Sequence, residues 1–496
     1  MRAAHLADLA VIAAYLAGIT WFGARFRKSQ HDLKDYFLGG RITPWWAIAL
    51  SIVSAETSTL TVIGTPALAF GGDFGFLQVV LGYLLARVVI STLFLPHYFR
   101  GEMFTAYELM RRRFGERVRR FTAATFLILR ALAEGVRVFA LSLIVSIVLA
   151  PLYARMGAAA WAEAGSIFVI VCLTLFYTFE GGLTAVIWTD VVQMFLYVGG
   201  AVLSFFVLLN RIPGGWAHAM SAAEAAGKFR VFDFRFSLTP AFFSRPYSFW
   251  AGVIGGCFLT TASHGTEQLM VQRLLAARNE SESRLALYSS WIVILFQFTL
   301  FLAIGAFLFV WYRDAHLARP NPPDRLYPDF VWNNLPAGVA GLVIAAILAA
   351  GMSNLSAALN ALASTTIMDF YKPIFASAAI SQGRLMLLAR RATVLWGAVL
   401  FAIALVARNV KSVLEAGLSV ASVLYGALLG AFLLGLLTKR VMGNAAMLGM
   451  AASLISMLCV NRLTHLAFTW YVVVGTAITV FVGLAGSLIF RREDAT

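Results

Sequence analysis

The sequence predicts an all-α membrane protein with about thirteen transmembrane helices, and three observations support this prediction. Only 13% of the 496 residues are charged, 60% are hydrophobic, and the mean hydropathy is +0.80. A soluble domain has about 25% charged and 45–50% apolar residues. A chain so poor in charge covers its surface in lipid rather than in water. Long apolar stretches and short basic clusters between them are the other two observations.

The apolar stretches have the length that a membrane helix requires, which is about 20 residues. The expected spans are 5–23, 44–70, 75–97, 119–153, 164–179, 185–210, 247–270, 285–312, 336–367, 392–408, 412–437, 442–460 and 467–490. The first stretch has no convincing cleavage site, so we expect a retained span rather than a signal peptide. No soluble domain fits between the spans, and we expect one membrane domain over residues 1–496.

The basic clusters orient these spans. Despite a net charge of +15, the basic residues lie between apolar stretches rather than along helices, which argues against nucleic-acid binding. The clusters are Arg25 to Arg41, Arg111 to Arg120, Arg390 with Arg391, Lys439 with Arg440, and Arg491 with Arg492. By the positive-inside rule we expect a multi-pass protein of the cell inner membrane, with a periplasmic N-terminus and a cytoplasmic C-terminus. The long loops 211–246 and 313–335 then face the periplasm, and four prolines make the second an extended connector.

The second span is unusually polar at its centre. It carries Glu56 and Thr57, further hydroxyl residues up to Thr61, and then the sequence Gly64-Thr65-Pro66. A broken helix whose exposed carbonyl groups line a cavity explains this composition. The alternative is a proline kink with the hydroxyl groups bonded to their own helix.

The seventh span repeats this pattern five spans later. Gly255 and Gly256 precede a polar run from Thr260 through His264 and Glu267. Two interrupted spans at corresponding positions in two halves of a chain indicate an inverted-repeat transporter with its site at the interruptions. His264 is a candidate solute ligand or a packed, hydrogen-bonded histidine, and Glu267 lies in the site or near the cytoplasmic boundary.

The ninth span and the fourth span each carry a polar face. Ser353, Ser356, Asn360 and Ser364 recur at helical spacing, and such neutral oxygens suit a hard cation such as Na⁺. Small-residue helix packing is the alternative. In the fourth span Arg130, Glu134 and Arg137 share one face, with Arg87 in the third span. These arginines pair with Glu134 for structural reasons or attract an anionic solute.

Several motifs in order resemble the sodium:solute symporter family. They are Asp35 to Arg41, Glu180 to Gln193, Glu267 to Arg273, and Ser353 to Tyr371. The resemblance covers nearly the whole chain and implies alternating access by a five-plus-five inverted repeat of the leucine-transporter type. The repeats would span approximately 44–210 and 247–437, with accessory helices 5–23, 442–460 and 467–490. It also implies Na⁺ as the coupling ion.

The resemblance also implies particular site residues. The main Na⁺ site would use the positions Leu50, Val53, Ala350, Ser353 and Asn354, with an amide replacing the second hydroxyl. A second cation site would use Asp190 and Ser356, with Ala357 replacing a serine; helix capping is the simpler role for Asp190. On the third span, Val80 and Tyr83 stand where sugar transporters of the family carry sugar ligands. With Arg87 nearby, the segment resembles the branch that carries carboxylates and other small anions.

We therefore expect a sodium-coupled symporter of a small organic solute, with a carboxylate or another anion as the candidate. The expected solute ligands are Glu56, Thr57, Tyr83, His264, Glu267, Arg87 and Arg130. The first alternative is a proton-coupled symporter that uses Glu56, Asp190 or Glu267, and the second is a solute sensor without flux. The sequence stops at Thr496 shortly after the last expected span, which argues against a sensor with its own signalling domain but not against one that acts through a partner. No catalytic constellation or cofactor motif indicates an enzyme, and we expect a solute and the bilayer as partners, without nucleic acid or an obligate protein partner.

Overall fold

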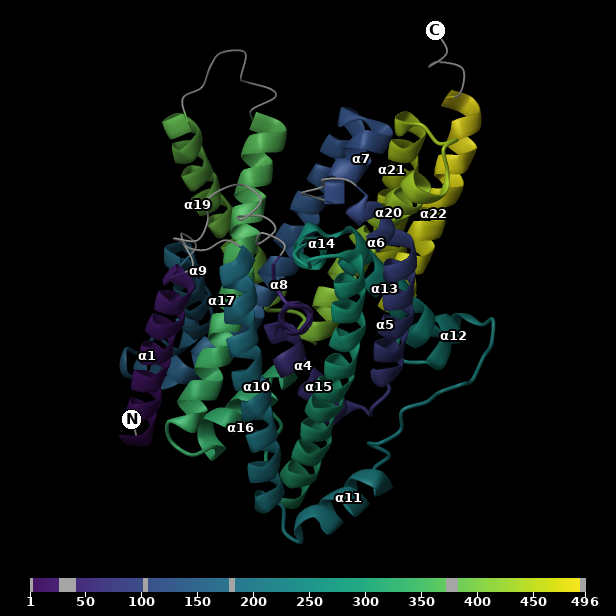
Figure 1. Cartoon of the computed structure of the whole chain (residues 1–496). Helices are drawn as coiled ribbons and strands as arrows, with labels where there is room; N and C mark the ends of the chain where they lie inside the picture. The colour runs from purple at the N-terminus through teal and green to yellow at the C-terminus, as the bar shows by residue number, and fades with distance from the viewer. Residues whose placement is uncertain (1–2, 26–41, 101–105, 178–182, 372–381, 491–496) are drawn as a thin grey trace.

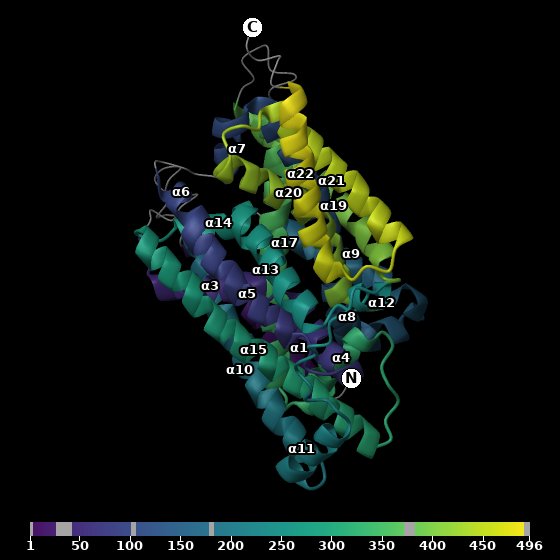
Figure 2. The same cartoon turned by 90° about the vertical axis from the view of Figure 1, so that its right-hand side faces the viewer.

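The computed structural model describes residues 3–25, 42–100, 106–177, 183–371 and 382–490, and within these ranges all regular structure is helical. The bundle is shown in Figures 1 and 2. Its long helices are α1 (Ala3–Arg25), α3 (Trp45–Glu56), α4 (Thr59–Gly71), α5 (Leu77–Val89), α8 (Glu116–Arg155), α9 (Ala162–Tyr177), α10 (Leu183–Arg211), α13 (Phe249–Thr266), α15 (Glu280–Asp314), α17 (Val339–Thr365), α19 (Gln382–Ala407), α20 (Val413–Leu437), α21 (Gly443–Leu463) and α22 (Phe468–Phe490).

Each of the thirteen expected segments coincides with helical structure. In the described residues, nine helices are long and apolar enough to cross a membrane, and the bent pair α3 and α4 adds a tenth. The third segment continues from α5 through a π-helical turn (Ile90–Phe94) into α6 (Leu95–Phe99). Shorter apolar helices cover Leu6–Ile19 and Ala162–Leu175. The prediction of an all-α membrane protein is therefore confirmed.

The second span is broken, but not at the Gly64–Pro66 sequence that suggested it. The helices α3 and α4 meet at an angle of 62°, with the break at Thr57 and Ser58. Thr57 leaves helical geometry with a ψ of 77°, and Ser58 is extended. Pro66 instead lies inside α4. The hydroxyl cluster, rather than the proline, therefore marks the place where the backbone opens.

The seventh span is broken as expected. Helix α13 ends at Thr266, Glu267 is extended, and α14 (Gln268–Leu275) continues the span. Helix α5 packs closely along α13, because a side chain on Gly82 would lie 2.4 Å from the carbonyl oxygen of Val253, and one on Gly256 would lie 2.4 Å from that of Val79. The same span reaches the second break further along the chain, where the hydroxyl of Tyr98 donates to the carbonyl oxygen of Gly265.

The long loops contain more structure than the sequence indicates. The segment 313–335, expected to be an extended connector, instead contains helix α16 (Leu326–Asn334) with Tyr327, Phe330 and Trp332 buried. Proline is tolerated in the first turn of a helix, where its missing N–H has no partner to lose. The loop 211–246 contains α11 (Gly215–Ala225) and the short α12 (Pro240–Phe243).

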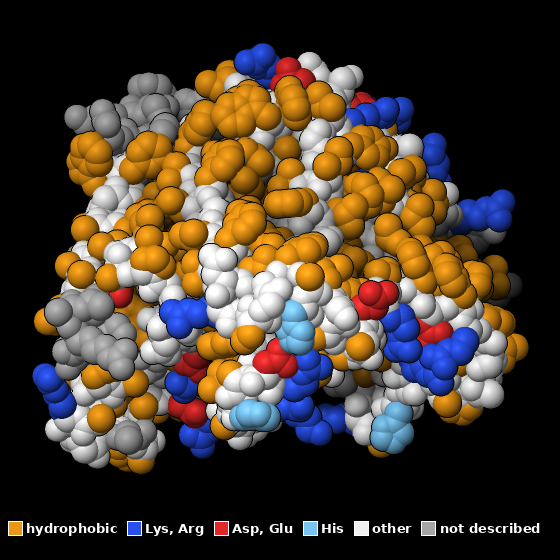
Figure 3. All heavy atoms as spheres, turned by 90° about the horizontal axis from the view of Figure 1, so that it is seen from below, with side chains coloured by type: hydrophobic (Ala, Val, Ile, Leu, Met, Phe, Trp, Pro, Cys, Tyr) orange, Lys and Arg blue, Asp and Glu red, His pale blue; other side chains and the backbone are white. Residues whose placement is uncertain are grey.

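The two ends of the bundle differ in the loops that they carry. Figure 1 places the N-terminus, α11 and α16 at one end, and helix α7 (Ala106–Phe114) and the C-terminus at the other. We call these the long-loop side and the basic-loop side. Figure 3, which views the molecule from below Figure 1, shows hydrophobic side chains over a broad area and charged side chains gathered along one part of the surface. Most of the first basic cluster and the motif residues Asp35 and Glu180 lie outside the described residues.

Candidate functional site

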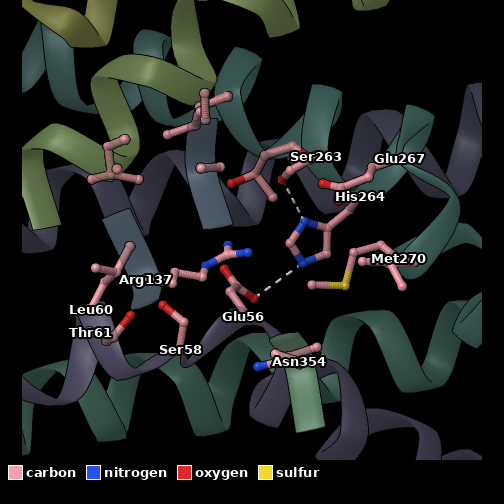
Figure 4. A pocket seen from close by; sticks show the side chains of 18 of the residues that line it. Glu56, Ser58, Leu60, Thr61, Arg137, Ser263, His264, Glu267, Met270 and Asn354 are labelled. Carbon is pink, nitrogen blue, oxygen red and sulfur yellow. Dashed lines mark hydrogen bonds and ion pairs between the residues drawn. The ribbon is translucent and has the colours of Figure 1, made fainter. Parts of the chain in front are cut away.

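A cavity of about 140 Å³ lies between the two broken spans. Its lining includes residues of α3, α4, α5, α8, α13, α14, α15, α17 and α20. Seven of the sequence-predicted site residues line it: Glu56, Tyr83, Arg130, His264, Glu267, Ser353 and Asn354. Figure 4 shows the side chains of Glu56, Arg137 and His264 pointing toward one another from three different helices.

Glu56 is held by an arginine from behind the cavity. Its Oε2 accepts a hydrogen bond from Arg87 at 2.8 Å. Arg87 is fully buried and also donates to the carbonyl oxygens of Leu287 and Tyr83. Because its donors are used within the protein, Arg87 fixes Glu56 rather than facing the cavity. Thr57 is also behind the lining, where its hydroxyl donates to Gln297 Oε1 at 3.0 Å.

A second ion-pair network crosses from α8 to the second break. Arg130 contacts both Glu134, at 2.9 Å, and Glu267, at 2.8 Å. Arg137 also donates to Glu134, so that one carboxylate serves two guanidinium groups. The hydroxyl of Tyr425 donates to the other oxygen of Glu267 at 2.5 Å. The pairing of Glu134 with its helical neighbours was predicted, whereas the bond between Arg130 and Glu267 depends on the fold.

A third ion pair joins the basic-loop ends of three helices. The carboxylate of Asp190, on α10, accepts from Arg273 of α14 at 3.0 Å and from the Ser51 hydroxyl of α3 at 2.7 Å. Arg273 also donates to Ser51 Oγ at 2.9 Å, and all three residues are buried. We call this group the basic-loop layer. Asp190 therefore has a cation partner within the chain, and its role as a second cation ligand with Ser356 stays a prediction.

Three aromatic side chains and one carboxylate close the cavity toward the long-loop side. Phe76 stacks on Phe298 with a centroid distance of 5.0 Å, and both line the cavity. Tyr247 packs edge-on against Phe76 at 5.8 Å, and its hydroxyl donates to Glu415 at 2.6 Å. We call these four residues the long-loop layer. No pattern in the sequence marked them.

The expected Na⁺ ligands lie where α17 passes the first break. Ser353 and Asn354 line the cavity, and among the described residues neither side chain has a hydrogen-bond partner, so their oxygens suit a hard cation. The carbonyl oxygen of Val53 accepts one hydrogen bond, from Thr57, and keeps a second lone pair. Leu50 is on the same helix, whereas Ala350 and Ser356 are on α17 outside the cavity lining. Asn360 and Ser364 are exposed, so the polar stripe of α17 does not face the cavity along its full length.

Sequence reasoning missed several lining residues. Phe76, Phe298, Met270 and Tyr425 sit in apolar stretches and look like ordinary core residues. Thr59 was visible as a hydroxyl near the break, but its importance depends on packing. Its buried Oγ1 has no hydrogen-bond partner and lies 2.7 Å from the position that a side chain on Gly351 would take. Thr59 therefore brings a free hydroxyl oxygen against α17, two residues from Ser353.

The charges around the cavity balance. Five charged side chains line it, namely Arg130, Arg137, Arg273, Glu56 and Glu267. Their ion-pair partners behind the lining are Arg87, Glu134 and Asp190. These residues are four arginines and four acids, so the described site is neutral when every histidine is neutral. Such a site can accept an anion and a cation together without a net buried charge.

Two discontinuous helices meeting at a central, charge-balanced cavity define a secondary transporter. The model of the sodium:solute symporter family matches residues 36–453, and the chain belongs to this family. The sodium/sialic acid symporter NanT of Aliivibrio fischeri is 30% identical over 97% of this chain and 92% of its own length. The human sodium/iodide cotransporter is 30% identical over 88% of this chain and 66% of its own length.

Solved structures agree with this assignment. The substrate-bound, outward-open structure of a Na⁺-coupled sialic acid symporter superimposes with a TM-score of 0.81 at 28% identity, covering 98% of each chain. A nucleobase-cation-symport-1 family transporter in a closed conformation gives a TM-score of 0.55 at 12% identity over 92% of this chain, which shows likeness of fold alone. The chain is a multi-pass membrane transporter rather than an enzyme, and Na⁺ is the coupling ion of its family.

Proposed function

We propose that this symporter moves a small organic anion with a carboxylate group, and that Arg137 binds this carboxylate. The observation that carries the proposal is the position of Arg137 within the balanced network. Its side chain is 26% exposed and lines the cavity, whereas that of Arg130 is 7% exposed and bridges two glutamates. Among the described residues the Nε atoms of Arg130 and Arg137 both lack a hydrogen-bond partner, so it is the greater exposure of Arg137 that distinguishes the two. A planar guanidinium with a free donor is the group that recognises a carboxylate.

Relatives support the same class of solute. The names of the relatives include transporters of sialic acid, iodide and monocarboxylates, all of which carry anions at neutral pH. A site with equal numbers of buried acids and arginines gains one negative charge when such a solute enters. A Na⁺ ion near Ser353 and Asn354 restores neutrality, and this mutual attraction couples the two ligands, since each one raises the affinity for the other.

The proton-coupled alternative is less well supported. Its three candidate carboxylates, Glu56, Asp190 and Glu267, each contact an arginine. A proton on one of these carboxylates would leave its arginine as a buried, unpaired charge. These carboxylates are therefore poor carriers of a transported proton, and Na⁺ remains the proposed driving ion.

Binding measurements on purified protein test the anion assignment. We would measure dissociation constants in NaCl for a sialic acid, lactate and iodide, and for the neutral amide of each carboxylate. We expect an acid to bind and its amide to bind at least about tenfold more weakly, because the amide cannot pair with Arg137. Arg137→Gln should weaken the acid by about 10- to 100-fold, whereas Arg155→Gln, at the exposed end of the same helix, should bind normally. Equal affinity for acid and amide contradicts the proposal.

Thermal unfolding in NaCl against KCl at equal ionic strength tests the Na⁺ site without a known solute. Na⁺ at 100 times its dissociation constant adds about 2.7 kcal/mol of stability. We expect Ser353→Ala to lose the difference between the salts and Ser364→Ala, on the exposed part of α17, to keep it. A Ser353→Ala protein that still distinguishes the two salts would place Na⁺ elsewhere.

A further inference from the structure

We propose that His264 takes up a proton when the solute anion binds, so that the affinity for the anion rises as the pH falls. The inference rests on the proposed anionic solute and adds a second ion to the site. His264 is 2% exposed, lines the cavity, and lies two residues before the break that ends α13. It is the one histidine in the cavity lining of the described residues.

The hydrogen bonds of His264 are incomplete in the neutral state. Its Nδ1 lies 2.8 Å from Ser263 Oγ, and the Ser263 hydroxyl is within reach of the Thr260 carbonyl oxygen, at 3.3 Å. Its Nε2 lies 3.2 Å from Glu56 Oε2, a contact that becomes an ion pair when the imidazole is protonated. Figure 4 shows both contacts. A buried ring nitrogen that faces a carboxylate can hold a proton there.

A neutral imidazole carries one N–H and cannot satisfy both neighbours fully. If Nδ1 carries the proton, the lone pair of Nε2 faces the Glu56 carboxylate. If Nε2 carries it, the single hydrogen of the Ser263 hydroxyl can be donated either to Nδ1 or to the Thr260 carbonyl oxygen, but not fully to both. The imidazolium donates to Ser263 and to Glu56 at once, and Ser263 then remains free to donate to Thr260. Protonation therefore completes the local hydrogen bonding.

Other titratable groups surround His264. They are Glu56 on α3, Tyr83 and Arg87 on α5, Arg130, Glu134 and Arg137 on α8, Glu267 and Arg273 on α14, and Tyr425 on α20. The glutamates are paired with guanidinium groups, which stay charged at all relevant pH values. Histidine titrates near neutral pH when unperturbed. Of these groups, His264 is the one imidazole, and its Nε2 faces a carboxylate.

The balance of charge decides when the proton binds. Four arginines and four acids leave the cavity neutral, and a proton on His264 would leave a buried positive charge. Entry of an anion removes that cost, so anion and proton each strengthen the binding of the other. A Na⁺ ion bound near Ser353 would also compensate the negative charge of the anion. We therefore expect a low pH to offset a low Na⁺ concentration in part.

The test is the dissociation constant of the anion identified among a sialic acid, lactate and iodide, measured from pH 5.5 to 8.5 at a fixed Na⁺ concentration that does not saturate the Na⁺ site. The affinity should fall with rising pH, by up to about tenfold per pH unit for one linked proton. His264→Gln keeps an N–H donor but cannot titrate, so its affinity should not depend on pH. His218→Gln removes an exposed histidine of α11 and should keep the wild-type slope.

A second measurement needs no variant. A pH-indicator dye in weakly buffered solution should report proton uptake when the anion is added to the wild-type protein near neutral pH, and none when an equal volume of NaCl is added. A wild-type affinity that does not change with pH overturns the inference while leaving the proposed function intact, as does a slope that survives in His264→Gln. Failure of every anion to bind with Na⁺ at any pH overturns the proposed function itself.

Discussion

The two layers that close the cavity differ in chemistry. The basic-loop layer joins α3, α10 and α14 through the buried charges of Asp190 and Arg273 and the hydroxyl of Ser51. The long-loop layer consists of the aromatic contacts of Phe76, Phe298 and Tyr247 and one hydrogen bond to Glu415. Separating a buried ion pair requires that both charges find new partners, whereas aromatic rings can slide apart without leaving an unpaired polar group.

This difference indicates that the two sides open at different cost. Opening the long-loop side breaks one polar contact, between half-buried residues. Opening the basic-loop side breaks an ion pair whose two residues are buried. We therefore expect the protein without solute to open more readily toward the long-loop side, which the basic clusters predict to be periplasmic. A solute that enters from the long-loop side would contact Arg137 and His264 before the ion pair of the basic-loop layer separates.

Breaking the basic-loop ion pair should have the largest effect. We expect Arg273→Gln to lower the free energy of unfolding by about 3–5 kcal/mol, because Asp190 is left as a buried, unpaired charge. Thermal unfolding in detergent measures this loss. The double variant Arg273→Met with Asp190→Leu should recover most of it, since it leaves no charge behind. A single variant as stable as the wild type would show that the layer is not held by its ion pair.

The long-loop side should respond to pH through Asp324. Burial raises the pKa of this carboxyl from 3.8 to about 6, and Glu415 adds to the shift. The folded protein thus holds a proton that the unfolded chain releases, so the stabilisation is complete below pH 4 and is lost as the pH rises through 6. Between pH 5 and 7.5 we expect a loss of roughly 1.5 kcal/mol.

The matched variant for this prediction is Asp324→Asn, which keeps the shape and cannot titrate. Its Oδ1 can still accept from the backbone N–H of Val413, which the Asp324 carboxylate binds at 3.1 Å. Melting temperatures of both proteins at pH 5 and pH 7.5 provide the comparison. Parallel changes with pH in the two proteins would exclude Asp324 as the group responsible.

The smallest effect is expected for Tyr247→Phe. The substitution removes the hydrogen bond to Glu415 but keeps the ring against Phe76, so we expect a loss of about 1 kcal/mol. Tyr471→Phe, which removes a hydroxyl bonded to Asn461 outside the layer, is the control. If Tyr247→Phe cost as much as Arg273→Gln, the proposed difference between the two layers would be wrong.

Sequence reasoning located the two breaks because their composition has no place in a lipid-facing helix. The hydroxyl cluster after Glu56 and the polar run to Glu267 mark the breaks to within a few residues, whereas Pro66, the strongest single signal, lies inside a helix. Proline disfavours a helix, but neighbouring helices can tolerate its missing hydrogen bond. The helix in the 313–335 loop was missed because its prolines stand at its start.

Part of the candidate site could be recognised from the sequence, again because its residues are unusual in an apolar span. Charged residues at membrane depth, such as Glu56 and Arg130, are conspicuous in any apolar sequence. Their partners are not, because Arg87 with Glu56 and Arg130 with Glu267 are contacts between different helices. Helical spacing predicts neighbours on one helix, as it did for Glu134, and says nothing about pairs across the bundle.

The sequence by itself determined the class of fold, the positions of the spans and the polar residues that could serve a solute or an ion. These properties depend on composition and periodicity, which determine segment by segment whether the chain favours lipid or water. The tertiary structure alone decided which arginine neutralises which acid, that Arg137 lines the cavity with a partly exposed side chain, and that the Nε2 of His264 faces the carboxylate of Glu56. Charge balance and unsatisfied hydrogen bonds are properties of groups that meet only after folding, because they arise from helices far apart in the sequence.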